Sequence, residues 1–245
     1  MDIYSFCVQW AVDHAHGRPI RVLDYGCGAG TIVTALRGRG IDAFGCDVYY
    51  DGGDYSSAVD PAVLGTTIRR MERGTIPFDA SSFDAVINNQ VLEHVEDLDA
   101  VLAEIARVLR PGGTVFSLFP DAGVWREGHC GIPFLHWFPK GSALRVYYAA
   151  ALHQCGLGYH RENKTAMQWS RDFCHWLDQW THYRSARQIN ASFQAQFCAL
   201  RPLEEKFLRD RLGARAYLLR PFPLGLQRLI VRKLGGLMFE ARKAG

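Results

Sequence analysis

Three alternating glycines follow a short apolar run near the start of the chain, and this pattern limits the fold more than any other feature. The run at residues 20–25 has the sequence IRVLDY, the glycines are Gly26, Gly28 and Gly30, and a helical pattern begins at Thr31. Glycine tolerates positive φ angles and lets the backbone approach a ligand closely. The segment therefore predicts a strand, a tight turn and a helix, with a ligand bound at the turn.

Strand and helix signals alternate through the first half of the chain. Apolar runs at residues 42–47, 83–89 and 114–119 predict further strands, residues 98–109 have helical spacing, and residues 2–16 predict a leading helix. Alternating strands and helices build a mostly parallel sheet that is covered by helices on both faces. We therefore expect an α/β fold.

The glycine spacing separates two classes of nucleotide ligand. A dinucleotide-binding turn has the pattern G-x-G-x-x-G, whereas here Thr31 stands in place of the third glycine. Asp47 ends the second predicted strand, 23 residues after Asp24, where a carboxylate accepts hydrogen bonds from both ribose hydroxyls. Asp24 itself is placed for an amino group or its bound water. The pattern favours a nucleoside ligand over a nicotinamide dinucleotide.

Five segments resemble motifs of the class I S-adenosylmethionine-dependent methyltransferases. They are VLDYGCGAG at 22–30, GCD at 45–47, IPFDASSFDAV at 76–86, LEHV at 92–95 and RVLRPGG at 107–113. This resemblance implies a Rossmann-like, mostly parallel seven-stranded sheet with helices on both faces and a helical insertion before the last strand. It also implies S-adenosyl-L-methionine as cofactor and S-adenosyl-L-homocysteine as product.

The resemblance further assigns cofactor contacts to residues of this chain. By that likeness, the glycine turn lines the methionine part, Asp47 holds the ribose and Val48 packs against the adenine. Asn89 and Gln90 would reach the methionine amino group. The full set of cofactor-binding candidates is Asp24, Tyr25, Gly26, Cys27, Gly28, Gly30, Asp47, Val48, Glu72, Arg73, Asn89 and Gln90.

The same likeness divides the chain into four parts. We expect an N-terminal helix over residues 1–19, a methyltransferase core over 20–164, a helical insertion or cap over 165–234, and the final strand of the core sheet within 235–245. Leu157–Lys164 would be the hairpin partner of that final strand.

Candidate catalytic residues come from a loop and from the end of the fourth strand. Aromatic, imidazole and charged groups gather at residues 121–140, and a histidine there suits proton transfer from an attacking hydroxyl. We take His129, His136 and His94 as the candidates. The alternative is that these histidines pack in the core or bond to backbone carbonyls. The spacing of the histidines and cysteine in this loop, and the carboxylates near them, do not match a standard metal site, so no metal is predicted.

An aromatic stripe runs through the predicted insertion. Its members are Trp169, Phe173, Trp176, Trp180 and Tyr183, which recur at helical spacing. Such a stripe is typical of the buried face of a helix, with the alternative that one edge lines an acceptor pocket.

Charge is unevenly distributed along the chain. The net charge is only +3, yet residues 201–245 hold eleven basic and four acidic side chains. Residues 223–234 are basic and amphipathic. They could contact an anionic membrane peripherally or bind a phosphorylated acceptor. The alternative is a solvated helix face that packs on the sheet. So small a net charge does not indicate a protein that tracks phosphates, so we do not expect nucleic acid as a partner.

Composition bounds the cellular setting. The chain starts without the pattern of a signal peptide and has no long uninterrupted apolar run. The seven cysteines include no Cys-x-x-Cys pair, which favours reduced thiols. We expect a cytoplasmic protein, with membrane contact through residues 201–234 at most peripheral.

These observations together predict an enzyme. It would transfer a methyl group from S-adenosyl-L-methionine to an oxygen, in second place a nitrogen, of a small molecule, a glycan or a lipid-linked intermediate. Two alternatives stay open. One is a non-catalytic cofactor-binding subunit of methyltransferase type, and the other is a nucleic-acid methyltransferase, which only the basic C-terminal region supports.

Overall fold

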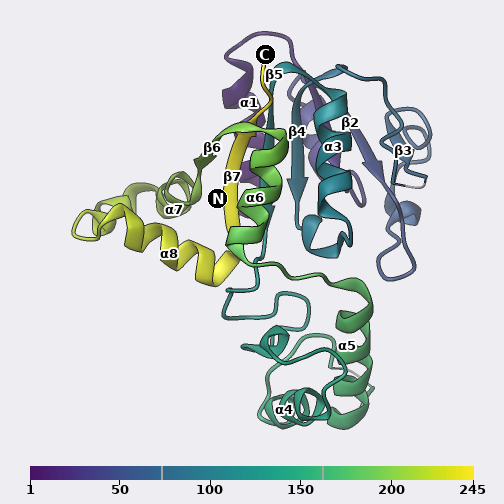
Figure 1. The fold of residues 1–245 in the computed structure, drawn as a ribbon, viewed down its shortest axis with the longest axis vertical. Coiled ribbons are helices and arrows are strands. Elements are labelled where there is room, and N and C mark those ends of the chain that lie inside the picture. Colours follow the sequence, from purple (N-terminus) through teal and green to yellow (C-terminus); the bar gives the residue numbers. More distant parts are fainter. Residues whose placement is uncertain (73, 162) are drawn as a thin grey trace.

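The computed structural model describes residues 1–72, 74–161 and 163–245 and contains a seven-stranded sheet in the order β3-β2-β1-β4-β5-β7-β6 (Figure 1). The strands are β1 (Arg21–Tyr25), β2 (Asp42–Asp47), β3 (Ile68–Arg70), β4 (Phe83–Asn89), β5 (Leu109–Phe119), β6 (Cys198–Pro202) and β7 (Leu237–Arg242). The first five are parallel, β7 is antiparallel to β5, and β6 is antiparallel to β7. The predicted Rossmann-like α/β fold is confirmed.

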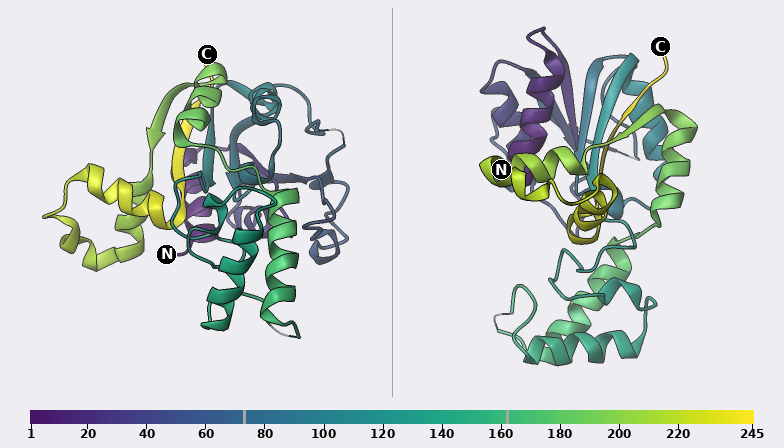
Figure 2. Two further views of the ribbon diagram at one scale, coloured as in Figure 1. Left: turned by 60° about the horizontal axis from the view of Figure 1, so that its bottom comes forward. Right: turned by 90° about the vertical axis from the view of Figure 1, so that its left-hand side faces the viewer.

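Helices cover both faces of the sheet (Figure 2). One layer contains α1 (Ile3–Ala15) and α2 (Thr31–Arg37), and the other contains α3 (Leu98–Val108) and α6 (Ala186–Gln196). Side chains alternate between the two faces of a strand, so that Val22 packs on the α1 layer and Leu23 on the α3 layer. Both side chains are fully buried, which is why apolar residues occupy consecutive positions in the middle of β1.

The turn from β1 into α2 depends on Gly30. This residue caps α2 with a left-handed φ of 78°, and a Cβ at its position would lie 2.4 Å from Cδ1 of Ile68 in β3. The β1–α2 turn therefore rests directly on the edge strand, and a Cβ at Gly30 would have to displace the end of the Ile68 side chain.

A separate helical lobe lies beyond the carboxyl ends of the parallel strands, at the bottom of Figure 1. It comprises η3 (Leu135–Trp137), α4 (Ala143–Gln154) and α5 (Ala166–Trp180). Its own small core consists of Cys130, Ile132, Leu135, Ala149, Trp169, Cys174 and Leu177. Arg145 of α4 and Asp178 of α5 form an ion pair across the two helices.

The predicted hairpin partner of the last strand is wrong. Among the residues that the structure describes in Leu157–Lys164, none is in a strand, and β6 pairs with β7 instead. Gly156 and Gly158 have φ angles of 95° and 99°, which break an extended conformation. The carbonyl of Tyr159 accepts a hydrogen bond from Trp169 Nε1 at 2.8 Å, so this segment packs against the lobe rather than the sheet.

The residues expected to form one helical insertion, 165–234, instead divide between three places. Helix α5 belongs to the lobe, α6 and β6 belong to the core sheet layer, and a hairpin lies between β6 and β7. This C-terminal hairpin comprises α7 (Glu204–Leu212), η4 (Gly213–Leu219) and α8 (Leu224–Gly235) and projects from the sheet in Figure 1. Two further short turns, η1 (Ser56–Ala58) and η2 (Leu92–His94), follow β2 and β4.

We predict that Gly30→Ala destabilises the protein by more than its backbone strain alone. Gly40 has the same φ of 78°, and no atom lies within 4 Å of the point that a Cβ would occupy there, so Gly40→Ala is the matched control. The control is expected to cost about 1–2 kcal/mol for the left-handed conformation, and Gly30→Ala about 1–3 kcal/mol more for the collision. Urea unfolding measures both.

The collision partner provides the second half of this test. Ile68→Val removes Cδ1, and should therefore cost less stability in the Gly30→Ala background than in the native chain. Equal losses for Gly30→Ala and Gly40→Ala would contradict the proposed contact.

Candidate functional site

A cavity of about 1390 Å³ lies where the parallel strands end, between the sheet and α5. Ligands of open α/β sheets bind at this edge because the strand order reverses there and the connecting loops separate. Nine of the cofactor candidates line the cavity, namely Asp24, Tyr25, Gly26, Cys27, Gly28, Asp47, Val48, Asn89 and Gln90. We call this end of the cavity, around β1, β2 and β4, the cofactor end.

The glycine turn at the cofactor end is held by backbone bonds. The amides of Gly26 and Cys27 both donate to the carbonyl of Cys46, at 2.8 and 3.1 Å. A Cβ on Gly26 would lie 2.4 Å from Val91 Cγ2, and its φ of 71° is left-handed. The turn thus packs against β2 on one side and the β4 exit on the other, which leaves its backbone exposed to the cavity.

Asp47 has a fixed carboxylate at the same end. Its Oδ2 accepts from the Gly28 amide at 2.8 Å and its Oδ1 accepts from the Tyr49 amide at 2.9 Å. Each carboxylate oxygen can accept more than one hydrogen bond, so both remain available to a ligand. The arrangement suits a pair of neighbouring hydroxyls.

Asp24 adds a second carboxyl group beside Asp47. It is 3% exposed, and burial together with the negative charge of Asp47 raises the pKa of Asp24 well above its usual range. A cation or a hydrogen-bond donor bound next to Asp24 would relieve this penalty. The cofactor end is therefore built for a ligand that carries positive charge and hydroxyl groups.

Three cofactor candidates are placed differently. In the described part of the chain, neither Gly30 nor Glu72 is in the cavity wall; Gly30 instead contacts Ile68, and the side chain of Glu72 is exposed. Met71 lines the cavity in place of Glu72, since neighbouring side chains of extended backbone point in opposite directions. Arg73 lies outside the described residues.

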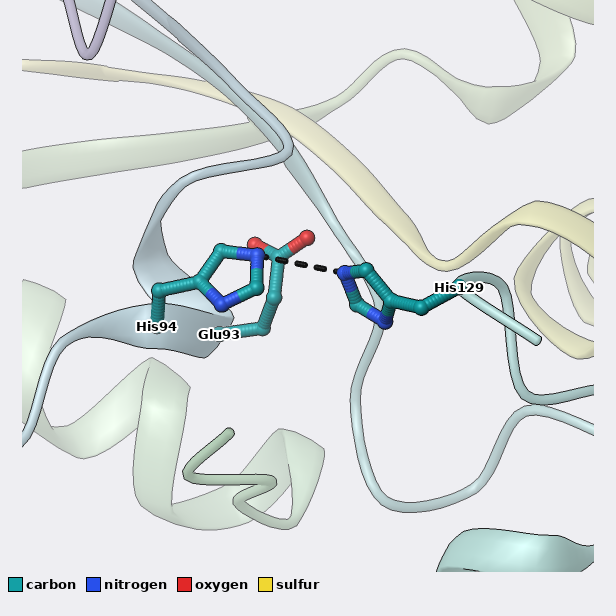
Figure 3. A group of neighbouring side chains, drawn as sticks. All are labelled: Glu93, His94 and His129. Atoms are coloured by element: carbon teal, nitrogen blue, oxygen red, sulfur yellow. Dashed lines mark hydrogen bonds between the residues drawn. The ribbon is translucent and has the colours of Figure 1, made fainter. Parts of the chain in front are cut away.

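Two histidines meet at the other end of the cavity, which we call the acceptor end. His94 comes from η2 after β4, and His129 comes from the loop after β5. Their Nε2 atoms lie 3.1 Å apart (Figure 3). Both side chains line the cavity, so two residues that are 35 positions apart in sequence form one functional group.

Buried partners fix the orientation of both rings. His94 Nδ1 lies 2.7 Å from the carbonyl oxygen of Trp180. His129 Nδ1 lies 2.7 Å from Oε1 of Glu127, which also accepts from the Tyr183 hydroxyl at 2.6 Å, while its Oε2 accepts from the Cys130 amide at 2.7 Å. Burial alone would raise the pKa of Glu127. The hydrogen bond and charge of His129, together with the hydrogen bonds from Tyr183 and the Cys130 amide, outweigh burial and lower this pKa to about 2.

The surroundings push the two imidazoles in opposite directions. Burial lowers the pKa of His94 to about 4. Burial also acts to lower the pKa of His129, but its hydrogen bond to ionised Glu127 and the charge there outweigh this effect and raise it. His94 is thus a neutral ring held beside a more basic one.

Glu93 is the third member of the cluster, and it lies in the LEHV segment at 92–95, although the sequence gave it no role of its own. It is 1% exposed, and neither carboxylate oxygen has a hydrogen-bond partner within the described residues. Burial raises the pKa of Glu93 to about 7. One Glu93 oxygen, one ring nitrogen of His94 and one ring nitrogen of His129 all lie within 4.8 Å of one another (Figure 3).

The third catalytic candidate, His136, lies apart from this cluster. Its ring packs against Tyr183 with centroids 4.7 Å apart, and it is not part of the cavity wall in the described chain. Neither ring nitrogen has a hydrogen-bond partner among the residues described. The structure therefore brings together two of the three candidate histidines.

Aromatic side chains of α5 cover the acceptor end. Phe173, Trp176 and Trp180 line the cavity, whereas Trp169 is in the lobe core. The stripe predicted as one buried face is thus shared between core and cavity. Tyr50 completes this wall, 4.9 Å from Trp180 between ring centroids, and no motif in the sequence indicated it.

Comparison with known proteins identifies the domain that carries the cofactor end. The family described as "Methyltransferase domain" matches residues 23–117. Residues 23–117, which include β1, β2 and β4 at the cofactor end, are thus similar to that family. This confirms the family that the sequence motifs indicated.

Relatives of the methyltransferase domain share only part of their length with this chain. The chain is 30% identical to the ubiquinone biosynthesis O-methyltransferase of Sinorhizobium fredii over 114 residues, which are 45% of this chain and 46% of that protein. Another enzyme of that name, from Rhizobium etli, is 29% identical over 143 residues. The chain thus matches about half the length of these curated relatives.

Solved structures share the fold over nearly the whole chain. An S-adenosylmethionine-dependent methyltransferase from Mesorhizobium loti has a TM-score of 0.54 at 17% identity, with 98% of this chain and 100% of that chain covered. The similarity at this identity establishes the fold and does not by itself assign a substrate.

We predict that Tyr183→Phe destabilises the protein by about 1.5–3 kcal/mol, because it removes a hydrogen bond to the ionised Glu127. Tyr148→Phe is the matched control, since its hydroxyl donates to the neutral carbonyl of Pro133 at 3.1 Å. The control should cost about 0.5–1.5 kcal/mol. Urea unfolding of the two variants at neutral pH compares them, and a smaller loss for Tyr183→Phe would contradict the buried charge on Glu127.

Proposed function

We propose that this protein transfers the methyl group of S-adenosyl-L-methionine to an oxygen of a small-molecule acceptor. The observation that carries this proposal is the single cavity that joins the glycine turn and Asp47 to the His94–His129 pair. Methyl transfer needs the donor methyl and the acceptor oxygen in line and in contact, and most of the rate gain comes from that positioning. A cavity with both ends in one space meets this requirement.

The cofactor end supports the choice of methyl donor. We assign the ribose to Asp47, the adenine to Val48 and Met71, and the methionine amino group to Asp24 and Asn89. Asn89 Oδ1 is buried and has no hydrogen-bond partner among the described residues, as a group awaiting an ammonium would be. When bound, the cofactor supplies an electrophilic methyl on a sulfonium, whose positive charge suits the two carboxyl groups.

The acceptor end supports an oxygen on a flat ring. Tyr50, Trp176 and Trp180 offer aromatic faces on which a planar acceptor can stack. The imidazoles of His94 and His129 would contact the acceptor hydroxyl. The curated relatives are named for O-methylation in ubiquinone biosynthesis, which supports oxygen over nitrogen. A glycan could stack on the same wall, and a lipid-linked acceptor would suit the membrane contact proposed below.

We predict that Asp47→Asn weakens binding of S-adenosyl-L-homocysteine about 10–100-fold. The substitution keeps the side-chain shape but removes the charge that strengthens hydrogen bonds to the ribose, worth roughly 1.5–3 kcal/mol. Isothermal titration calorimetry measures the affinity. Asp42→Asn, at the opposite end of β2 and exposed, is the control and should bind as the native protein does.

The same preparation tests the reaction. Native protein incubated with S-adenosyl-L-methionine and a panel of phenols, sugars, DNA and RNA should form S-adenosyl-L-homocysteine with a hydroxylated aromatic compound. Binding without turnover would instead favour a non-catalytic subunit, and turnover with nucleic acid alone would favour a nucleic-acid methyltransferase. Failure of the native protein to bind S-adenosyl-L-homocysteine at millimolar concentration would reject the proposal.

We infer in addition that the C-terminal hairpin contacts an anionic membrane surface. Its exposed apolar side chains are Tyr217, Leu218, Phe222, Leu224, Leu226, Leu229, Ile230 and Leu234, and its exposed basic side chains are Arg209, Arg211, Arg215 and Arg220. A surface that combines apolar and basic groups fits the interface of anionic lipids. Among described residues, no helix has both the length and the apolarity needed to cross a bilayer, so this contact would be peripheral.

We predict that native protein co-sediments with vesicles of mixed anionic and zwitterionic lipid and much less with purely zwitterionic ones. Leu229→Glu should lower the partition coefficient roughly tenfold. It replaces apolar area that would enter the membrane with a negative charge that the anionic lipid repels. Leu144→Glu changes an equally apolar residue, 66% exposed, on the lobe and should leave binding unchanged. Equal effects of the two variants would contradict the assignment to the hairpin.

A further inference from the structure

We propose that Glu93, His94 and His129 bind one divalent transition-metal ion of the Zn²⁺ type at the acceptor end of the cavity. Binding of the ion rests on the geometry of these residues alone. Its chemical use, considered last, rests on the proposed methyl transfer to oxygen.

The first step concerns the protons on the two rings. His94 Nδ1 faces the Trp180 carbonyl at 2.7 Å, and a carbonyl only accepts, so this nitrogen carries a hydrogen. His129 Nδ1 faces the Glu127 carboxylate at 2.7 Å, and ionised Glu127 also only accepts. In each neutral ring the Nε2 atom therefore has a bare lone pair.

The second step follows from the distance between those lone pairs. The two Nε2 atoms lie 3.1 Å apart, which is too close for two lone pairs that face each other with nothing between them. A positive species must lie between the rings, and it is either one additional proton or a metal ion. Two nitrogens that are each about 2.1 Å from one ion, at an angle of about 90–110°, lie roughly 3.0–3.4 Å apart, so the observed separation fits a shared metal.

The position of Glu93 favours the metal ion over the proton. A proton shared by the imidazoles would leave the Glu93 carboxylate buried at 1% exposure, with both oxygens unpartnered in the described structure. A buried carboxylate without a partner is costly. A metal ion would engage Glu93 together with both rings, since one of its oxygens already lies within 4.8 Å of the two nitrogens. Figure 3 shows the carboxylate beside the gap between the two rings.

The ligand set and its supports indicate the class of ion. Two imidazoles and one carboxylate form a three-ligand set typical of catalytic zinc, with a fourth position left for water or substrate. Imidazole ligands favour zinc, iron, cobalt or nickel over magnesium or calcium. The Glu127 carboxylate and the Trp180 carbonyl hold the outer nitrogens of the two rings, as the second layer around such metal ligands does.

The ion would have a direct use in the proposed reaction. Because His94 and His129 line the cavity, the open coordination position would face the acceptor. An acceptor hydroxyl held there would lose its proton to solvent more readily. Its oxygen then forms the bond to the methyl carbon while the carbon–sulfur bond breaks, and the electron pair of that bond stays on sulfur.

The test is a Co²⁺ titration of protein that has been treated with chelator and dialysed, followed by its visible absorption and by calorimetry. We expect one Co²⁺ per chain, displaced by one Zn²⁺ and not by millimolar Mg²⁺. Glu93→Gln, which keeps the side-chain shape, and His129→Ala should weaken binding at least tenfold. Glu127→Gln should weaken it about 10–100-fold through the orientation of His129.

His175→Ala is the matched control, because it removes an exposed imidazole of α5. It should leave the titration unchanged, and circular dichroism should show native helix content for every variant. Absence of Co²⁺ and Zn²⁺ binding at 1 mM, or binding that survives Glu93→Gln combined with His129→Ala, would overturn the site. Methyl transfer by such metal-free protein would then still support the proposed function, whereas a bound metal without S-adenosyl-L-homocysteine binding would reject that function alone.

Discussion

The structure depends on the backbone of one short turn, that between β1 and α2. Its amides bond to the carbonyl of Cys46 and to the carboxylate of Asp47, and its last glycine touches Ile68 of β3. Three strands are thereby fixed relative to one another by a segment with almost no side chains. A Cβ at Gly26 or Gly30 would collide with Val91 or Ile68, so the same absence of side chains that leaves room for a ligand also permits the packing of the sheet.

This dependence explains why so much of the core can be predicted from sequence. Strands buried on both faces are continuous apolar runs, and their ends carry the polar groups, so Asp24, Asp47 and Asn89 follow directly from locating β1, β2 and β4. The errors are local as well. The motif groups Gly30 with the cofactor-binding glycines, although the φ angle of Gly30 and its contact with Ile68 serve the fold. The motif also favours Glu72 over Met71, because it takes no account of the alternation of side chains along extended backbone.

The assembly of the acceptor end could not be predicted, although His94, His129 and the aromatic stripe were each candidates, because these segments are distant from one another in sequence. His94, His129 and Trp180 come from three separate segments, and only the fold of the lobe brings them together. The edge strand β6 gave no signal because three of its five residues are exposed and none is buried, so that it has no apolar run. Leu157 and Tyr159 offered a stronger apolar pattern, yet Gly156 and Gly158 turn that segment toward Trp169.

The two ends of the cavity have complementary electrostatic requirements in the proposed reaction. Asp24 and Asp47 favour a positively charged ligand, and the pair of imidazoles with Glu93 favours a cation that would stabilise an oxyanion on the acceptor. Transfer of a methyl group from sulfonium to oxyanion removes both charges at once, and attraction between them grows as water is excluded. The lobe, which lies over the strand ends and contributes Phe173, Trp176 and Trp180 to the wall, is the element that can exclude that water. Tyr183, which follows α5, and His129 both hydrogen-bond to Oε1 of Glu127. These bonds connect the lobe to the cluster of His94, His129 and Glu93.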